Sequence, residues 1–184
     1  ETFRPISAPE REALRKELGW SGRFVILNVS AMTGNKGIGL LFKAAAQASA
    51  RHPQILVALK GVNRMYQSDR VLSACIAGLT PAEQNRLRDR TWYAGEALPT
   101  ERVARLMQAA DVYLSPYYGE GFNLPALEAA ACGLPVICTR GGPTDDFVTD
   151  DFALRINSYE ASAPEGRRNL IPNPVHLGEL LQRA

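Results

Sequence analysis

The sequence has no uninterrupted apolar run of about 18 residues, the length that a membrane-spanning helix requires. Residues 1–5 do not begin a signal peptide, and the chain does not start with methionine. We therefore expect no transmembrane segment, and we expect the chain to be a fragment of a longer protein.

Cysteine and histidine are both scarce. Cys75, Cys132 and Cys138 lack the paired spacing of a metal site, and we expect two of them to be buried free thiols of a reducing cytoplasm. His52 and His176 lie far apart without a partner pattern, so we interpret both as structural or surface residues. We therefore predict that the chain binds no metal ion and that the protein is cytoplasmic. Any peripheral attachment to the inner membrane would occur through the rest of the protein.

Neither sign of charge dominates, because the sequence contains 21 basic and 19 acidic residues. The basic residues are dispersed, so the sequence has no electrostatic footprint for nucleic acid, and we assign most arginines to solvated helix faces. An apolar content of 46% is sufficient for a globular core, and 184 residues suit one domain.

Short apolar runs alternate with segments of helical periodicity along most of the chain. The runs are almost entirely apolar, which is typical of parallel strands covered by helices on both faces. Helix signals include a capping box at Thr80 and Glu83, a cap at Thr100 and a stop at Gly133. We expect strands at 24–29, 55–59, 91–93, 112–115, 135–138 and 153–156, and helices at 38–50, 71–77, 82–87, 101–110, 125–132 and from 173 onward.

This alternation predicts an α/β fold with a parallel sheet between two layers of helices. In such folds ligands bind at the carboxyl ends of the strands. The loops of interest are therefore those after Val29, Leu59, Tyr93, Ser115 and Cys138. Residues 147–172 are weakly patterned and predict little.

The first candidate stretch is Ser-Ala-Met-Thr-Gly-Asn-Lys-Gly at 30–37, between a predicted strand and a predicted helix. Its glycines let backbone amides approach a ligand, the helix N-terminus favours an anion, and Lys36 adds a positive charge. An ordinary turn with a surface lysine explains the stretch equally well.

The second stretch, 117–128, contains two glutamates. Glu120 is expected in the loop and Glu128 in the first helical turn, so that both can face one crevice and accept hydrogen bonds from sugar hydroxyls. Between them, the amides of 121–124 can hold phosphate. The alternative is a solvated Glu120 and a Glu128 that only complements the helix dipole.

Two shorter stretches follow other predicted strands. Lys60, Gly61 and Arg64 could contact a nucleotide, although a surface loop is at least as good an explanation. The backbone of Gly95-Glu96-Ala97-Leu98 at 95–98 could edge a base, or it could be a plain connection.

Three segments carry a family resemblance: Ala-Ala-Asp-Val-Tyr-Leu-Ser-Pro at 109–116, Glu-Gly-Phe-Asn-Leu-Pro-Ala-Leu-Glu-Ala at 120–129 and Cys-Gly-Leu-Pro-Val-Ile at 132–137. They resemble the C-terminal, donor-binding domain of the glycosyl transferases group 1 family, which are retaining, nucleotide-sugar-dependent enzymes with the GT-B fold. The resemblance covers residues 24–147 and includes the family's pair of glutamates. It implies a Rossmann-like, three-layer domain that forms one half of a GT-B fold.

The resemblance also implies roles for residues. Glu128 would bind the ribose, Glu120 would contact the donor sugar, and Lys36 would bind the pyrophosphate, with Glu120 and Lys36 as catalytic residues. The amides of 121–124 would hold the sugar and the distal phosphate, and the base would pack at Ala97. The full implied donor-binding set is Ser30, Ala31, Lys36, Lys60, Gly61, Ala97, Glu120, Gly121, Phe122, Asn123, Leu124 and Glu128.

Two positions depart from the family pattern. Ala31 stands where the family usually has an arginine, which removes a charge that would stabilise the leaving diphosphate; Lys60 or Arg64 are the candidates to replace it. Asn123 stands where a glycine is frequent, a mild change that bears on which sugar fits.

The leading hypothesis is therefore a domain that binds a nucleoside-diphosphate sugar, without cofactor or metal, for transfer to an acceptor hydroxyl of a glycan or lipid-linked sugar. A separate N-terminal domain would carry the acceptor site, so the chain alone should turn over little. A sugar-nucleotide epimerase and a non-catalytic binding module are the alternatives. We expect a linker and leading helix over 1–22, the nucleotide-sugar-binding domain over 23–172, and the start of a truncated helix over 173–184.

Overall fold

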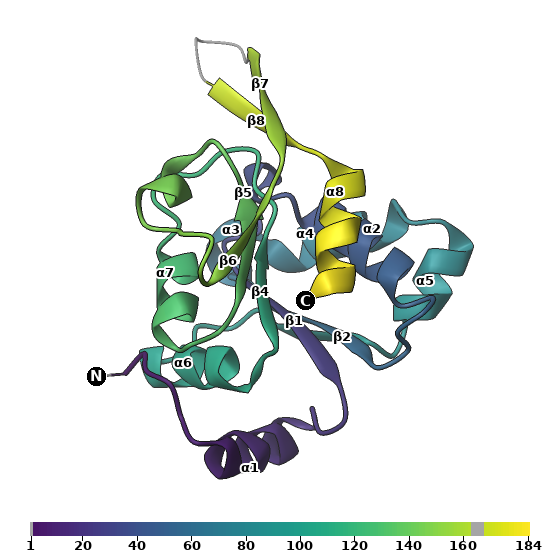
Figure 1. The fold of residues 1–184 in the computed structure, drawn as a ribbon. Helices are drawn as coiled ribbons and strands as arrows, with labels where there is room; N and C mark the ends of the chain where they lie inside the picture. Colours follow the sequence, from purple (N-terminus) through teal and green to yellow (C-terminus); the bar gives the residue numbers. More distant parts are fainter. Residues whose placement is uncertain (1, 163–167) are drawn as a thin grey trace.

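A computed structural model of the chain describes residues 2–162 and 168–184. A six-stranded sheet forms its centre, in the order β3-β2-β1-β4-β5-β6, and every neighbouring pair is parallel (Figure 1). This is the doubly wound order in which the strand sequence reverses between β1 and β4. The strands are β1 (Phe24–Val29), β2 (Ile55–Lys60), β3 (Thr91–Ala94), β4 (Val112–Ser115), β5 (Val136–Thr139) and β6 (Ala153–Ile156).

Helices cover both faces of the sheet, which confirms the predicted three-layer α/β class. Helices α1, α6 and α7 pack on one face, and α2, α4, α5 and α8 pack on the other. Side chains of β1 alternate between the two faces. Val25 and Leu27 belong to the core under α1, α6 and α7, and Ile26 belongs to the core on the opposite face. The helices are α1 (Ala8–Leu18), α2 (Ile38–Ala48), α3 (Asn63–Tyr66), α4 (Ser68–Ala77), α5 (Pro81–Leu87), α6 (Thr100–Ala109), α7 (Leu124–Ala131) and α8 (Pro174–Arg183), with 3₁₀ turns η1 (Gly34–Lys36) and η2 (Pro143–Asp146).

Local signals located most helix ends correctly. The capping box of Thr80 and Glu83 is present, and Gly133 follows α7 with a φ of 74°. The predicted cap at Thr100 is wrong, because Thr100 is the first residue of α6 and Pro99 is the N-cap, without a side-chain hydrogen bond.

Two elements were not expected from the sequence. Helix α3 is only four residues long, and an antiparallel hairpin of β7 (Ser158–Ser162) and β8 (Arg168–Pro172) lies in the weakly patterned region. Figure 1 shows the hairpin projecting beyond the body of the molecule. Its base is held by a hydrogen bond from the Leu170 amide to the Tyr118 carbonyl (2.7 Å), so tertiary contact rather than local pattern anchors it.

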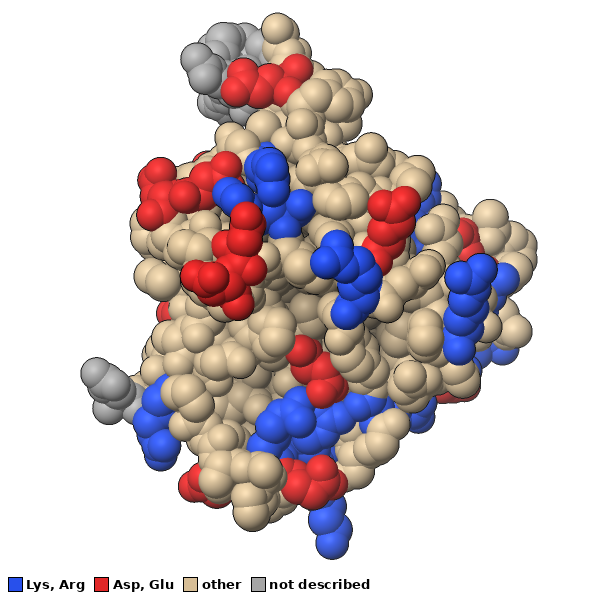
Figure 2. Space-filling view, in the orientation of Figure 1, with Lys and Arg blue, Asp and Glu red and all other residues tan. Residues whose placement is uncertain are grey.

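Acidic and basic side chains are interspersed on the face of the molecule that Figure 2 shows. No helix in the described part of the chain is long and apolar enough to cross a membrane. All three cysteines are free thiols, and burial raises the pKa of Cys132 and Cys138 to about 11, so both remain protonated near neutral pH.

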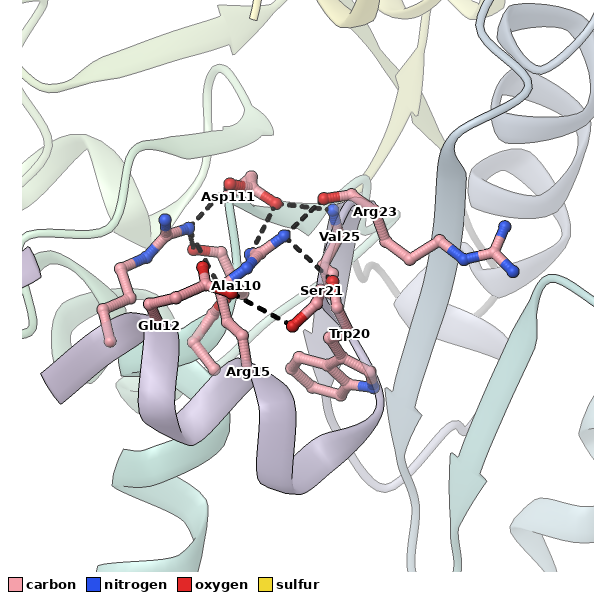
Figure 3. A network of polar contacts seen from close by, with 10 residues as sticks. Glu12, Arg15, Trp20, Ser21, Arg23, Val25, Ala110 and Asp111 are labelled. Atoms are coloured by element: carbon pink, nitrogen blue, oxygen red, sulfur yellow. Dashed lines mark hydrogen bonds and ion pairs between the residues drawn. The ribbon is translucent and has the colours of Figure 1, made fainter. Parts of the chain in front are cut away.

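An ion-pair network joins α1 to the amino end of the sheet (Figure 3). Asp111, just before β4, accepts hydrogen bonds from the Val25 amide (2.8 Å), from Arg15 (3.0 Å) and from Arg11 (2.6 Å). Arg15 is only 5% exposed and also donates to the Ala109 carbonyl (2.7 Å). The assignment of arginines to solvated helix faces is therefore wrong for Arg15, whose buried guanidinium donates to backbone carbonyls and to one carboxylate.

This network gives a stability prediction. Asp111→Ala removes the carboxylate and leaves the Arg15 guanidinium buried, so the free energy of unfolding should fall by about 3 kcal/mol. Urea denaturation followed by circular dichroism measures it. Asp89, exposed at the end of another helical segment, provides the control, and Asp89→Ala should change the free energy by less than about 0.5 kcal/mol. An equal effect of the two substitutions would contradict the role of Asp111.

Candidate functional site

Two loops meet at the carboxyl edge of the sheet, one between β1 and α2 and the other between β4 and α7. The Tyr118 amide donates to the Asn35 carbonyl (2.8 Å), and the Asn35 side-chain amide donates to the Gly119 carbonyl (2.6 Å). Gly37 has a φ of 67°, and a Cβ placed on it would lie 1.9 Å from the Pro116 carbonyl oxygen. Only glycine permits this approach, so the two loops are fixed against each other.

This loop contact brings Lys36 and Glu120 together. The Lys36 Nζ and the Glu120 Oε1 are 2.7 Å apart, and the two side chains are 18% and 9% exposed. The residues are 84 positions apart in the sequence. The structure therefore joins the two expected catalytic residues into one charged pair with little exposure to solvent.

Glu128 lies in the second turn of α7, as its fifth residue, and not in the first turn as expected. It is half-buried, and burial raises the pKa of its carboxyl group. The phenol of Tyr113 is fully buried and donates to the Val29 carbonyl (3.2 Å). Burial first, and then the charges of Glu120 and Glu128, raise the pKa of Tyr113. The charges of both carboxylates therefore act on the buried phenol of Tyr113, which donates to the end of β1.

The turn that begins α7 contains Asn123 in the left-handed conformation, with a φ of 67°. Asparagine adopts this conformation more readily than other non-glycine residues, which accounts for its presence where the family pattern has glycine. The Asn123 amide is buried and donates to the Ser115 Oγ (3.0 Å), so it holds the turn from inside. Phe122 and Leu124 are exposed, and α7 begins at Leu124 without a side-chain cap, so its N-terminus lies at the end of this loop.

The two shorter candidate stretches come together. The residues after β2 and the residues after β3 line one cavity of about 870 Å³, within the size range of small-ligand sites. Its walls include Arg64 and Ala97, while Lys60 and Gly61 precede them at the end of β2. The lining residues are Val62, Asn63, Arg64, Met65, Gly95, Glu96 and Ala97.

Ser30 and Ala31 continue β1 into the first loop. The Ser30 amide donates to the Lys60 carbonyl (3.0 Å), and the Ala31 carbonyl accepts from the Ser68 hydroxyl (2.9 Å). Ala31 thus lies between the pair of Lys36 and Glu120 and the cavity, with a methyl group where an arginine was expected. No sequence signal pointed to Ser68, because its contact links loops that are 37 residues apart.

Other groups named from the sequence lie outside this edge or lack ligand geometry. The Nδ1 of His176 accepts from the Asn157 amide (3.0 Å), a structural contact. Within residues 2–162 and 168–184, no group of three or more histidine, cysteine, aspartate or glutamate side chains could hold a metal ion.

Comparisons with known proteins bear on the family and on the fold. The family model described as glycosyl transferases group 1 matches residues 10–165. D-inositol 3-phosphate glycosyltransferase of Corynebacterium jeikeium is 31% identical over 76% of this chain and 33% of its own length. Among solved structures, sucrose-phosphate synthase of Thermosynechococcus elongatus is 26% identical with a TM-score of 0.72, over 99% of this chain and 40% of its own. Anabaena HepE in complex with UDP-glucose is 25% identical with a TM-score of 0.67, over 84% of this chain and 40% of its own.

The chain spans 33% of the length of the Corynebacterium jeikeium relative, so it corresponds to one part of such a protein. The two solved structures share its doubly wound sheet, and the HepE complex shows that a protein of this fold accommodates UDP-glucose.

Gly37→Ala tests the loop contact. The new Cβ forces the two loops apart, so we expect the free energy of unfolding to fall by about 1–3 kcal/mol and nucleotide affinity to fall with it. Gly34 lies in the same loop, and a methyl group added there would have no atom within 4 Å, so Gly34→Ala is the matched control and should be near neutral. Thermal unfolding and calorimetry measure both effects, and a harmless Gly37→Ala would show that the approach to Pro116 is not required.

Proposed function

Because the chain belongs to the glycosyl transferases group 1 family, we propose that it is the donor-binding part of a retaining glycosyltransferase. The observation that carries the proposal is the nearly buried pair of Lys36 and Glu120 beside the N-terminus of α7. A cation and a helix N-terminus favour a diphosphate, and a carboxylate accepts hydrogen bonds from sugar hydroxyls. A nucleoside-diphosphate sugar has both of these groups next to each other.

Each part of the donor has a matching part of the site. We assign the diphosphate to Lys36 and the amides of 121–124, and the sugar hydroxyls to Glu120. We assign the ribose hydroxyls to Glu128, whose half-buried carboxyl group lies close enough to Tyr113 for its charge to raise the pKa of that phenol. The base enters the cavity that Ala97 lines, and Lys60 and Gly61 precede this cavity at the end of β2.

The chemical step requires stabilisation of the diphosphate as the bond to the sugar breaks. Lys36 and the positive end of the α7 dipole provide it without a metal ion, because both are in place before the reaction. Glu120 and Glu128 orient the donor in this proposal, and they do not act as the acid and nucleophile of a glycosidase. Transfer with retention then depends on an acceptor hydroxyl of a glycan or lipid-linked sugar, supplied by another part of the protein.

We propose that the enzyme acts in the cytoplasm and uses nucleotide sugars as donors. The acceptor site lies in a separate N-terminal domain. The chain by itself should bind the donor with little turnover. A sugar-nucleotide epimerase would need an acid-base group beside the donor sugar, and in the described residues neither histidine lies in this site. Full-length protein that binds donor and acceptor but transfers nothing would favour a non-catalytic module, for which the alanine at position 31 is the supporting feature.

Glu128→Ala tests the ribose assignment. Loss of charged hydrogen bonds to the ribose should weaken binding of the preferred nucleotide by about tenfold or more. Isothermal titration calorimetry against UDP, GDP, ADP and their sugars measures it, and Glu101→Ala on the exposed start of α6 is the control. Absence of binding to every nucleotide by the parent chain would overturn the proposed function, while unchanged binding by Glu128→Ala would overturn only this residue's role.

Glu120→Gln tests the ion pair. In the structure Glu120 neutralises Lys36, so a neutral amide frees the lysine for phosphate while it weakens contacts with sugar hydroxyls. We expect affinity for the nucleoside diphosphate to stay equal or to rise by up to about fivefold, because a neutral amide at this position no longer competes with the phosphate for the Lys36 ammonium group as strongly as the carboxylate does. Affinity for the corresponding nucleotide sugar should fall. Calorimetry with the two ligands measures the ratio, and a parallel decrease for both would show that Glu120 does not distinguish them.

A further inference from the structure

Lys60 is a buried cation without a buried counter-ion. It ends β2, a strand that otherwise reads Ile-Leu-Val-Ala-Leu, and it is only 6% exposed. Its Nζ donates to the carbonyl of the next residue, Gly61. Within the described parts of the chain, no carboxylate lies within ion-pair distance of it, whereas the other buried cation, Arg15, contacts Asp111.

Such a lysine is unfavourable for folding. Removal of an ammonium group from water costs free energy that one carbonyl cannot return, and burial accordingly lowers the pKa of Lys60. The nearest negative influence is Glu96, an exposed residue that partly offsets this effect. A residue that works against stability at a strand's carboxyl end indicates a ligand that needs the charge.

The position of Lys60 specifies the ligand group. Its carbonyl accepts from the Ser30 amide, so it lies beside the loop that carries Ala31 and Lys36. The cavity assigned to the base begins two residues after it, at Val62. In the proposed site, Lys60 therefore lies between the loop assigned to the base and the loop assigned to the distal phosphate, where the phosphate attached to the ribose would lie.

We infer that Lys60 binds the ribose-linked phosphate of the donor and supplies the positive charge that Ala31 does not. Lys36 then contacts the distal phosphate, so the two lysines share the diphosphate. This inference rests on the proposed function and adds a residue-level division within that site. It also explains why a lysine is tolerated at the end of a strand whose other residues are apolar.

A ligand series separates the two lysines. Calorimetry with uridine, UMP and UDP, and with guanosine, GMP and GDP, compares the parent with Lys60→Met and Lys36→Met. Lys60→Met should leave nucleoside affinity unchanged and weaken monophosphate and diphosphate binding by about tenfold or more. Lys36→Met should weaken diphosphate binding and have little effect on the monophosphate. Lys43→Met, on the exposed face of α2, is the control and should change none of them.

Thermal unfolding adds a readout that is independent of ligand. Methionine fills a similar volume without a charge, so Lys60→Met should unfold at the same or a higher temperature than the parent. A large decrease would show that Lys60 is structural, and Lys60→Gln provides a second variant for the ligand series in that case. Equal losses for nucleoside, monophosphate and diphosphate would place Lys60 on the base or ribose and overturn the inference. If the parent binds UDP or GDP and Lys60→Met binds it with the same affinity, the inference is also overturned. If the parent binds no ligand of the series, both the inference and the proposed function are overturned.

Discussion

The contact between the loop at 35–37 and the loop at 116–119 is the constraint on which the candidate site depends. Gly37 approaches the Pro116 carbonyl more closely than any side chain would permit, and Asn35 closes the contact with hydrogen bonds in both directions. Because the loops follow the adjacent strands β1 and β4, the contact lies where the strand order reverses. Lys36 and Glu120 are neighbours for this reason and not because of any local preference.

The two ends of the parallel sheet serve different purposes. At the amino end, Asp111 gathers two arginines and the Val25 amide, and this network holds α1 against the sheet. At the carboxyl end, glycines, a helix N-terminus and charged groups remain available to a ligand. Parallel strands make this separation general, since all their carboxyl ends meet at one edge.

The buried charges show the same division. Arg15 donates to a carboxylate and to backbone carbonyls, so its buried charge is compensated within the fold. Lys36 is neutralised by Glu120, a partner that a phosphate can replace. Lys60 has only a backbone carbonyl, and its charge is the least compensated of the three. The degree of internal compensation thus indicates which charges belong to the scaffold and which await a ligand.

The strands of the six-stranded sheet, most helix ends and the class of the fold could be predicted from the sequence, because apolar runs, capping residues and glycine stops act over a few residues. It also predicted Glu120 and Glu128 as candidate residues from one contiguous motif, and Lys36 from a separate stretch at 30–37. Four features are visible only in the folded chain. They are the pairing of Lys36 with Glu120, the shared cavity of the loops after β2 and β3, the hairpin of β7 and β8, and the burial of Arg15 and Lys60. These features depend on contacts between distant segments, and their energies are set by the surroundings of each group, which no local pattern encodes.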